Sequence, residues 1–273
     1  MSTTALLLAL AAAVLHASWN LLVARARDPE AATSVAMVVA VVVYAPIAIM
    51  GWRLERAAIP FLVATSLLHL VYVPLVPAAY RRADVSVVYP IARGIAPLIV
   101  LALGVLALRA PTSPLEVGGI CLVAAGVLLV RGIRRAAPAG IFLGLLIACV
   151  IAAYTLNDSY GVDHASAFTY LELSMVFPAL AYALALARLR GRAALRRELN
   201  LSSFAAGVAT FGSYGLVLVA LQRAPAAPVA AVRETSIVIA AALAALVLGE
   251  RVTPARVLGA AVVAAGVALV SLA

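Results

Sequence analysis

Charged residues are scarce in this sequence, and lysine is absent altogether. Only 11% of the 273 residues are charged, while 66% are hydrophobic and the mean hydropathy is +1.14. A soluble domain has about 25% charged and about 45–50% apolar residues, and a disordered chain is poorer still in apolar ones. The composition therefore excludes both classes and predicts a polytopic membrane protein whose main partner is the lipid bilayer.

Residues that build catalytic and metal sites are also few. Cys121 and Cys149 lie in apolar runs with no Cys or His at ligand spacing, so we interpret both as small core residues. The sequence has no HExxH motif, no nucleotide-binding loop and no cluster of metal ligands. We therefore expect no catalytic residue, no metal and no cofactor. We also expect no nucleic-acid partner despite the net charge of +9, because the arginines fall between long apolar runs.

Ten apolar runs follow one another with short connections, and each is near the length of about 20 residues that a spanning helix needs. The first run has polar His16 and Asn20 where a signal peptide has its cleavage site, so we treat it as a retained helix. We predict an all-α fold with ten transmembrane helices. Their approximate ranges are 4–24, 32–52, 59–80, 84–108, 114–131, 139–157, 164–187, 200–221, 226–248 and 254–272.

The arginines are distributed unevenly between the two sets of loops. The loops after the odd-numbered spans hold 14 arginines and those after the even-numbered spans hold 4. The remaining two, Arg93 and Arg233, lie inside spans. The positive-inside rule therefore places the odd-numbered loops in the cytoplasm and both termini outside.

The two halves of the chain resemble each other, because 88–130 aligns with 229–270 at an offset of about 140 residues. Each half holds five spans, and five is odd, so the second half enters the membrane upside down. Inverted repeats that meet near the bilayer midplane are a transporter architecture. We predict two inverted five-helix repeats, at 1–135 and 136–273. The matched pairs are Arg93 with Arg233, Pro114 with Pro254, Gly119 with Gly259 and Gly126 with Gly266.

Each half ends in a Pro followed by Gly-x6-Gly, and the second carries LGERVTPARVLGAAVVAAG at 248–266. This arrangement resembles the EamA-type branch of the drug/metabolite transporter superfamily over essentially the whole chain. The first half departs from it, because LALRAPTSPLEVGG (106–119) lacks the Glu of LGE. The resemblance implies a secondary transporter with a cavity between the halves and both termini in the cytoplasm. We keep the opposite orientation, because no basic residue lies in 1–20 or after Arg256.

Charged residues inside spans are the main candidates for a substrate site. A charge at mid-membrane costs about 2.5–3.5 kcal/mol even on permissive scales, so it faces a partner or a wet cavity. Arg93 and Arg233 occupy equivalent places, Glu234 follows the second, and Glu172 lies in the seventh span. Two interpretations stay open. Either the four side chains neutralise one another, or the arginines bind an anionic group while Glu172 or Glu234 is a counter-ion or proton site.

Two prolines flank Arg93 in YPIARGIAP, and we expect the helix to break there. Further polar and aromatic side chains share helix faces that should point inward. For each one alone, an interhelical hydrogen bond is as good an explanation as a ligand contact. His16 and His69 are also candidates for a proton relay. This second group of substrate-site candidates is His16, Trp19, Asn20, His69, Tyr72, Tyr89, Tyr154, Asn157 and Tyr214.

The predicted function is secondary transport of a small anionic or zwitterionic metabolite, of amino acid or organic acid type, across the cell (plasma or inner) membrane. A channel or a membrane subunit of a larger complex is the alternative. An intramembrane enzyme is disfavoured, because Asp158 and Asp163 lie at a loop edge and not as a membrane pair. The glycine-rich faces of the fifth and tenth spans predict close packing between halves or between two protomers. The substrate, the direction, proton coupling and a homodimer stay open.

Overall fold

All ten predicted spans are helical in the computed structural model, which describes residues 1–131, 137–248 and 253–273. Within these ranges, nine helical spans are long and apolar enough to cross a membrane, and α5 is a shorter tenth. The helices are α1 (Thr3–Ala24), α2 (Pro29–Met50), α3 (Ile59–Tyr80), α4 (Val85–Leu106), α5 (Pro114–Arg131), α6 (Pro138–Gly161), α7 (Ala167–Arg190), α8 (Arg192–Arg197), α9 (Leu201–Leu221), α10 (Ala226–Arg233), α11 (Thr235–Leu248) and α12 (Pro254–Leu272), with a 3₁₀ turn, η1, at Arg56–Ala58.

Several helices begin where a short polar side chain satisfies free backbone N–H groups. Asp28 accepts hydrogen bonds from the N–H groups of Glu30 and Ala31, and Pro29 follows as the first helical residue of α2. Thr253 accepts from the N–H of Arg256 at the start of α12 in the same way. Caps and a proline at this position favour a helix start, which is why α2 begins three residues before the predicted span.

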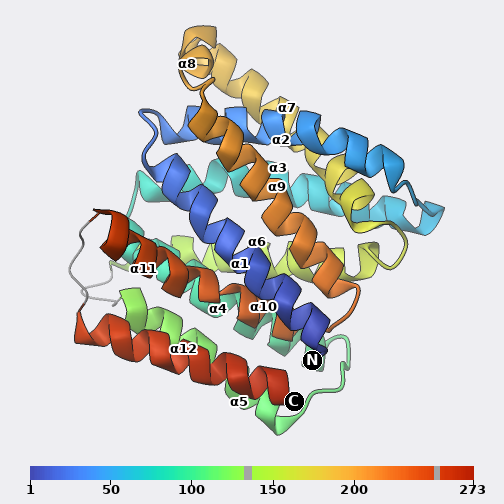
Figure 1. Ribbon diagram of the computed structural model, residues 1–273, viewed down its shortest axis with the longest axis vertical. Coiled ribbons are helices and arrows are strands. Elements are labelled where there is room, and N and C mark those ends of the chain that lie inside the picture. The colour runs from blue at the N-terminus through green and yellow to red at the C-terminus, as the bar shows by residue number, and fades with distance from the viewer. Residues whose placement is uncertain (132–136, 249–252) are drawn as a thin grey trace.

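The two halves interdigitate as layers of helices (Figure 1). At one end of the long axis α5 lies beside α12, and at the other end α2 and α7 lie near the short helix α8. Between them, α1 packs on α9, while α4 and α3 both pack on α6. Except for α7 with α8, these helix pairs join the first half to the second. The fold is thus a polytopic all-α bundle of two inverted five-helix repeats.

The contact between α5 and α12 depends on glycine. A Cβ atom on Gly126 would lie 2.8 Å from the carbonyl oxygen of Gly259, and one on Gly266 would lie 2.6 Å from that of Gly119. Only residues without a Cβ allow two helix backbones to approach this closely. The glycine faces therefore serve the packing of one half on the other.

The loops gather at two ends of the bundle. One end, which we call the arginine-rich end, carries the connections after α1, α3 and α7. Here Arg190 forms ion pairs with Asp28 and Glu30, both at 2.8 Å, and Arg81 also pairs with Glu30. At the opposite end, the Arg53 guanidinium donates to the backbone oxygen of Ala165 at 3.2 Å. Both chain termini lie on the side of this opposite end (Figure 1). Arg134 and Arg135 lie outside the described residues, as do 249–251 of the LGER string (248–251), which include Arg251.

Three expectations from the sequence were wrong. The helix does not break at Arg93, because α4 is continuous and each internal proline removes only one of its hydrogen bonds. The break occurs instead in the ninth span, between α10 and α11. Cys121 and Cys149 are exposed and not in the core, since lipid is as apolar as a protein interior and exerts no drive to bury them. Asp158 lies inside α6, which extends to Gly161.

Candidate functional site

A cavity of about 310 Å³ lies between the two halves, and we call it the central cavity. Its walls come from α1, α2, α3 and α4 of the first half and from α6, α7, α9 and α10 of the second. It reaches the arginine-rich end at Glu30, Tyr80 and Tyr182, and its inner part is bounded by Arg93 and Arg233. Polar side chains thus line a path from one end of the bundle into its interior.

Both intramembrane arginines line the central cavity and are almost fully buried, with exposed fractions of 4% for Arg93 and 3% for Arg233. The Arg93 Nε lies 2.9 Å from Oε2 of Glu234, and its Nη2 donates to the hydroxyl of Ser236 at 3.5 Å. Arg93 and Glu234 therefore form a buried ion pair.

Arg233 has no such partner. Among the described residues, no carboxylate lies within 4.0 Å of its guanidinium, and its buried Nε and Nη2 have no hydrogen-bond acceptor. The Arg93–Glu234 pair is neutral as a whole, so Arg233 leaves one positive charge on the cavity wall. A buried charge without a partner is expensive, and an anion that enters the cavity lowers this cost.

The backbone turns irregularly next to Arg233. α10 ends at this residue, and two i→i+3 hydrogen bonds of 3.0 Å span the break, from the Glu234 N–H to Ala231 and from the Ile237 N–H to Glu234. The Thr235 hydroxyl donates to the Val232 carbonyl at 2.8 Å. The turn directs Glu234 towards Arg93 while Arg233 stays on the cavity wall.

Most of the remaining sequence candidates also line the cavity. On α1, the Trp19 Nε1 lies 3.3 Å from the His16 Nδ1, and the Asn20 amide donates to the His16 carbonyl at 2.7 Å. Ten of the thirteen candidates lie on the cavity wall. These are His16, Trp19, Asn20, His69, Tyr72, Tyr89, Arg93, Tyr154, Tyr214 and Arg233.

Four of these side chains form an aromatic cluster in the cavity wall. The ring centroid of His69 is 4.7 Å from that of Tyr154 and 6.1 Å from those of Tyr72 and Tyr214. Tyr154 and Tyr214 meet edge to face at 5.9 Å. Such rings give a rigid surface with apolar faces and hydroxyl groups at the edges.

Three candidates lie away from the cavity wall. Glu234 is behind it, in the pair with Arg93, and Asn157 donates to the Phe61 carbonyl at 2.8 Å. Glu172 is 8% exposed, and its Oε2 has no hydrogen-bond partner in the described part of the chain. No Arg or His nitrogen described by the structure lies within 4.0 Å of Glu172, so it is not placed as a counter-ion to either arginine.

Sequence reasoning missed Asp158. This residue is fully buried in the last turns of α6, and its carboxylate accepts hydrogen bonds from the hydroxyls of Thr65, Tyr170 and Tyr214. Asp158 follows Tyr154 by four residues, so the two side chains share one face of α6. This spacing is visible in the sequence. The prediction failed because the sixth span was ended too early, at residue 157.

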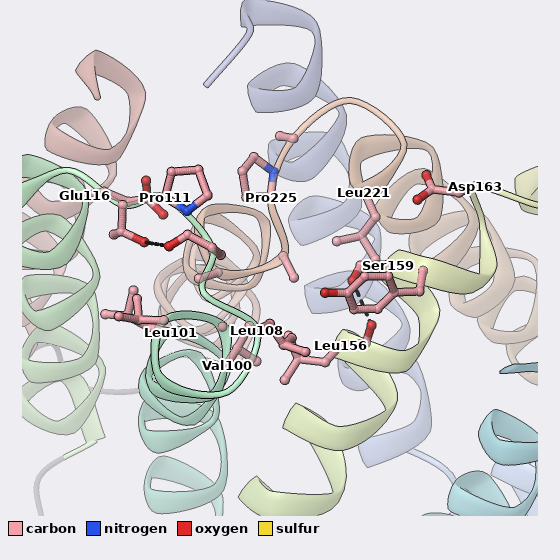
Figure 2. Close-up of a pocket in the computed structure, with 18 residues that line it drawn as sticks. Val100, Leu101, Leu108, Pro111, Glu116, Leu156, Ser159, Asp163, Leu221 and Pro225 are labelled. Atoms are coloured by element: carbon pink, nitrogen blue, oxygen red, sulfur yellow. Dashed lines mark hydrogen bonds between the residues drawn. The ribbon is translucent and has the colours of Figure 1, made fainter.

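A smaller pocket of about 220 Å³ lies at the opposite end of the bundle (Figure 2). The α4–α5 connection contributes Leu108 and Pro111, and α6 contributes Leu156 and Ser159. Pro225 of the α9–α10 connection completes the wall (Figure 2). This opposite-end pocket and the central cavity share no lining residue.

Ten membrane-spanning helices in two inverted halves, with a charged cavity between them, define a multi-pass membrane protein of the transporter class. The model of the EamA-like transporter family matches this chain twice, over 3–132 and 138–272. The chain therefore belongs to the EamA-like transporter family, within the drug/metabolite transporter superfamily.

The fold is found among solved structures. One of them, titled only "Crystal structure of protein", superposes with a TM-score of 0.79 at 15% sequence identity, and the match covers 100% of this chain and 98% of that chain. At this identity the likeness shows the fold alone. No curated protein matches the sequence. The exact division into repeats at residue 135 stays a prediction.

Proposed function

We propose that this transporter moves a small anionic or zwitterionic metabolite, of amino acid or organic acid type, by alternating access across the cell membrane. The observation that carries the proposal is Arg233, a buried guanidinium on the cavity wall with no carboxylate partner in the described part of the chain. A guanidinium stays charged and binds a carboxylate through two parallel hydrogen bonds. Arg93 is neutralised by Glu234 and supports the site without being free to bind in the same way.

The size and lining of the cavity support a small organic substrate. Its volume of about 310 Å³ is at the lower end of the range of ligand pockets. The aromatic cluster of His69, Tyr72, Tyr154 and Tyr214 offers ring faces to an apolar body or, through cation–π contact, to an ammonium group. A substrate whose carboxylate binds Arg233 and whose remaining atoms lie among these rings contacts both features of the cavity.

The two unconnected cavities favour a transporter over a channel. The central cavity reaches only the arginine-rich end, whereas the pocket at the opposite end shares none of its lining. Access from one side at a time is the arrangement that inverted repeats exchange in alternating access. If the arginine-rich end is cytoplasmic, as the loop charges predict, the central cavity is open to the cytoplasm in this state.

A thermal-shift screen of L-amino acids and of mono- and dicarboxylates on the purified protein tests the proposal. We expect a carboxylate to stabilise the wild type and not Arg233→Gln. Arg233→Lys keeps the charge but loses the planar fork, and we expect it to bind roughly 10- to 100-fold more weakly. Arg223→Gln, at an exposed arginine of the α9–α10 connection, is the matched control and should bind as the wild type.

The compound that binds is then followed in proteoliposomes. A carrier gives saturable flux and counterflow, and a channel gives neither. Binding that survives in Arg233→Gln contradicts the anion site, and flux without saturation or counterflow contradicts the carrier.

A further inference from the structure

Asp158 is a buried carboxylate that is held by hydroxyl groups and not by a cation. Its exposed fraction is 0%, and Oδ1 accepts hydrogen bonds from the Thr65 hydroxyl and, at 2.9 Å, from the Tyr170 hydroxyl. Oδ2 accepts from Tyr214. In the described ranges, no Arg or His nitrogen lies within 4.0 Å of the carboxylate. Three O–H donors are therefore its direct partners among the described residues, and the Arg233 charge acts on it from beyond 4.0 Å.

These hydrogen bonds tie together helices from both halves. Thr65 belongs to α3 in the first half, whereas Asp158, Tyr170 and Tyr214 belong to α6, α7 and α9 in the second. Asn157 adds to the same group, since its amide donates to the Thr65 hydroxyl at 2.8 Å. We call these five residues the carboxylate latch. It fixes four helices to one another at a single level of the bundle.

The carboxylate latch lies between the two cavities. Tyr154 and Tyr214 line the central cavity, while Ser159 and Tyr160 line the pocket at the opposite end (Figure 2). Tyr154 of α6 lines the central cavity, while Leu156 and Ser159 of the same helix line the opposite-end pocket. Asp158 lies in this stretch of α6 and is bonded to Tyr214 of the central cavity wall, so its carboxylate lies where the two cavities come closest along the helix. α3 and α9 make few direct contacts with each other, and Asp158 links them through Thr65 and Tyr214, so separation of these two helices at this level breaks its hydrogen bonds.

Ionisation of Asp158 decides how strongly the carboxylate latch holds. Hydrogen bonds to a charged acceptor are about twice as strong as those between neutral groups. A proton taken from water onto either oxygen removes the charge and one acceptor site, and it makes the neutral group easier to bury. The same proton returns to water when the carboxylate forms again, so the step needs no other reactant.

We propose that Asp158 is a proton-binding site whose ionised form holds the opposite end shut and whose protonation releases it. Coupling of this step to a substrate rests on the proposed transport function, whereas the gating itself does not. Asp158 fits this role better than the two carboxylates that the sequence suggested. Glu234 is occupied by Arg93, and Glu172 joins no hydrogen-bond network between the described helices.

Other ionisable groups lie on α6 and on the helices that pack around it. The arginines stay charged and the tyrosines stay neutral between about pH 5 and 8, so His69 is the one of these groups whose ordinary pKa lies in that range. A variant without this imidazole therefore belongs in the test. The groups are His69 on α3, Arg93 on α4, Tyr154 on α6, Tyr170 on α7, Tyr214 on α9 and Arg233 on α10.

The experiment measures the distance between spin labels at the opposite end by pulsed electron paramagnetic resonance, in nanodiscs and without substrate. The labels are placed through Ile59→Cys at the start of α3 and Arg223→Cys in the α9–α10 connection, both exposed, after Cys121 and Cys149 are replaced by serine. We expect one short distance near pH 8 and a growing population of longer distances towards about pH 5.

Variants of the carboxylate latch decide whether Asp158 is the titrating group. Asp158→Asn should show the long distance at every pH. Tyr214→Phe removes one donor to the ionised carboxylate and should move the transition to higher pH by about one unit. Asp163→Asn, an exposed carboxylate five residues further along, and His69→Gln should keep the wild-type transition.

The proposal is overturned if the wild type shows no pH-dependent change or if Asp158→Asn keeps the transition. Should Asp158→Asn fail to fold, an unshifted transition in both Tyr214→Phe and Thr65→Val overturns it equally. A pH-dependent opening in a protein that binds no carboxylate contradicts the proposed function alone. Carboxylate binding without pH-dependent opening contradicts the proton site alone.

Discussion

Arg93 and Arg233 occupy equivalent positions in the two halves, yet one is paired and the other is not. Arg93 lies 2.9 Å from Glu234, whereas Arg233 has no carboxylate within 4.0 Å among the described residues. The asymmetry originates in one residue: Arg233 is followed by Glu234, and Arg93 is followed by Gly94. The duplicated fold thus supplies two arginines at similar places, and a single carboxylate pairs with one of them and not with the other.

The backbones around the two arginines differ as well. α4 continues through Arg93, and Gly94 allows it to approach α5, because a Cβ there would lie 3.3 Å from the side chains of Val127 and Leu128. α10 instead ends at Arg233. The first half therefore gives a rigid support, and the second gives an interrupted helix of the kind that transporters place at substrate sites.

The largest expected effect on stability comes from Arg93→Ala. This change leaves the Glu234 carboxylate buried with its closest counter-charge removed, and breaking a buried pair costs about 3–5 kcal/mol. Arg233→Ala removes a charge that has no partner, so its free energy of unfolding should be close to that of the wild type or higher. Unfolding in detergent micelles measures both, and equal losses in the two variants would contradict the distinction between a paired and an unpaired arginine.

Glu234→Gln should make the two arginines more alike. With the neutralising carboxylate gone, both guanidiniums are available to anions, and we expect the affinity for a dicarboxylate to rise roughly tenfold relative to a monocarboxylate. Competition binding at constant ionic strength measures this ratio. Glu172→Gln, at a buried carboxylate outside the cavity wall, is the control and should leave the ratio unchanged. A ratio that moves equally in both variants argues against a specific role of Glu234.

The smallest expected effect concerns the ion pair of Asp28 with Arg190, which is partly exposed to water at the arginine-rich end. It contrasts with the buried pair of Arg93 and Glu234. Partial burial alone would raise the pKa of Asp28, but hydrogen bonds from the Ala31 N–H and the Arg190 guanidinium lower it below its usual range. A lowered pKa stabilises the fold above about pH 4, and this contribution is lost as the pH falls through the folded-state pKa. Screening by water limits it to less than about 1 kcal/mol.

Asp28→Asn should remove this part of the acid dependence. Unfolding followed between about pH 3 and 7 tests it, with Asp163→Asn as an exposed carboxylate control. A wild-type stability that stays constant through this range contradicts the contribution of Asp28.

Local patterns predicted the spans well because length and hydropathy alone decide what crosses a bilayer. The third, fifth and last helices have the predicted bounds of 59–80, 114–131 and 254–272. The failures are at features that depend on neighbouring helices. The prolines of α4 suggested a break that packing on α5 and α6 does not require, and nothing in the apolar ninth span marked the turn at Glu234.

The sequence predicted most of the residues that line the site, but not which of their side chains contact one another. Polar residues in a span must face inward, so most of the selected side chains reached one cavity wall. Which arginine Glu234 contacts depends on a turn between two half-helices, and periodicity does not encode it. Asp158 was left out because the sixth span was ended at residue 157, and its three hydroxyl donors on α3, α7 and α9 could not be identified from the sequence.

The sequence by itself determined a membrane bundle of two inverted halves with an arginine in each, because apolar length, loop charge and internal repetition are properties of the chain. Only the tertiary structure decided that Arg93 is neutralised, that Arg233 faces the cavity without a partner and that Asp158 joins four helices. These contacts join side chains on different helices, and those of Asp158 span 12, 56 and 93 residues of sequence. Their geometry exists only after the helices have packed.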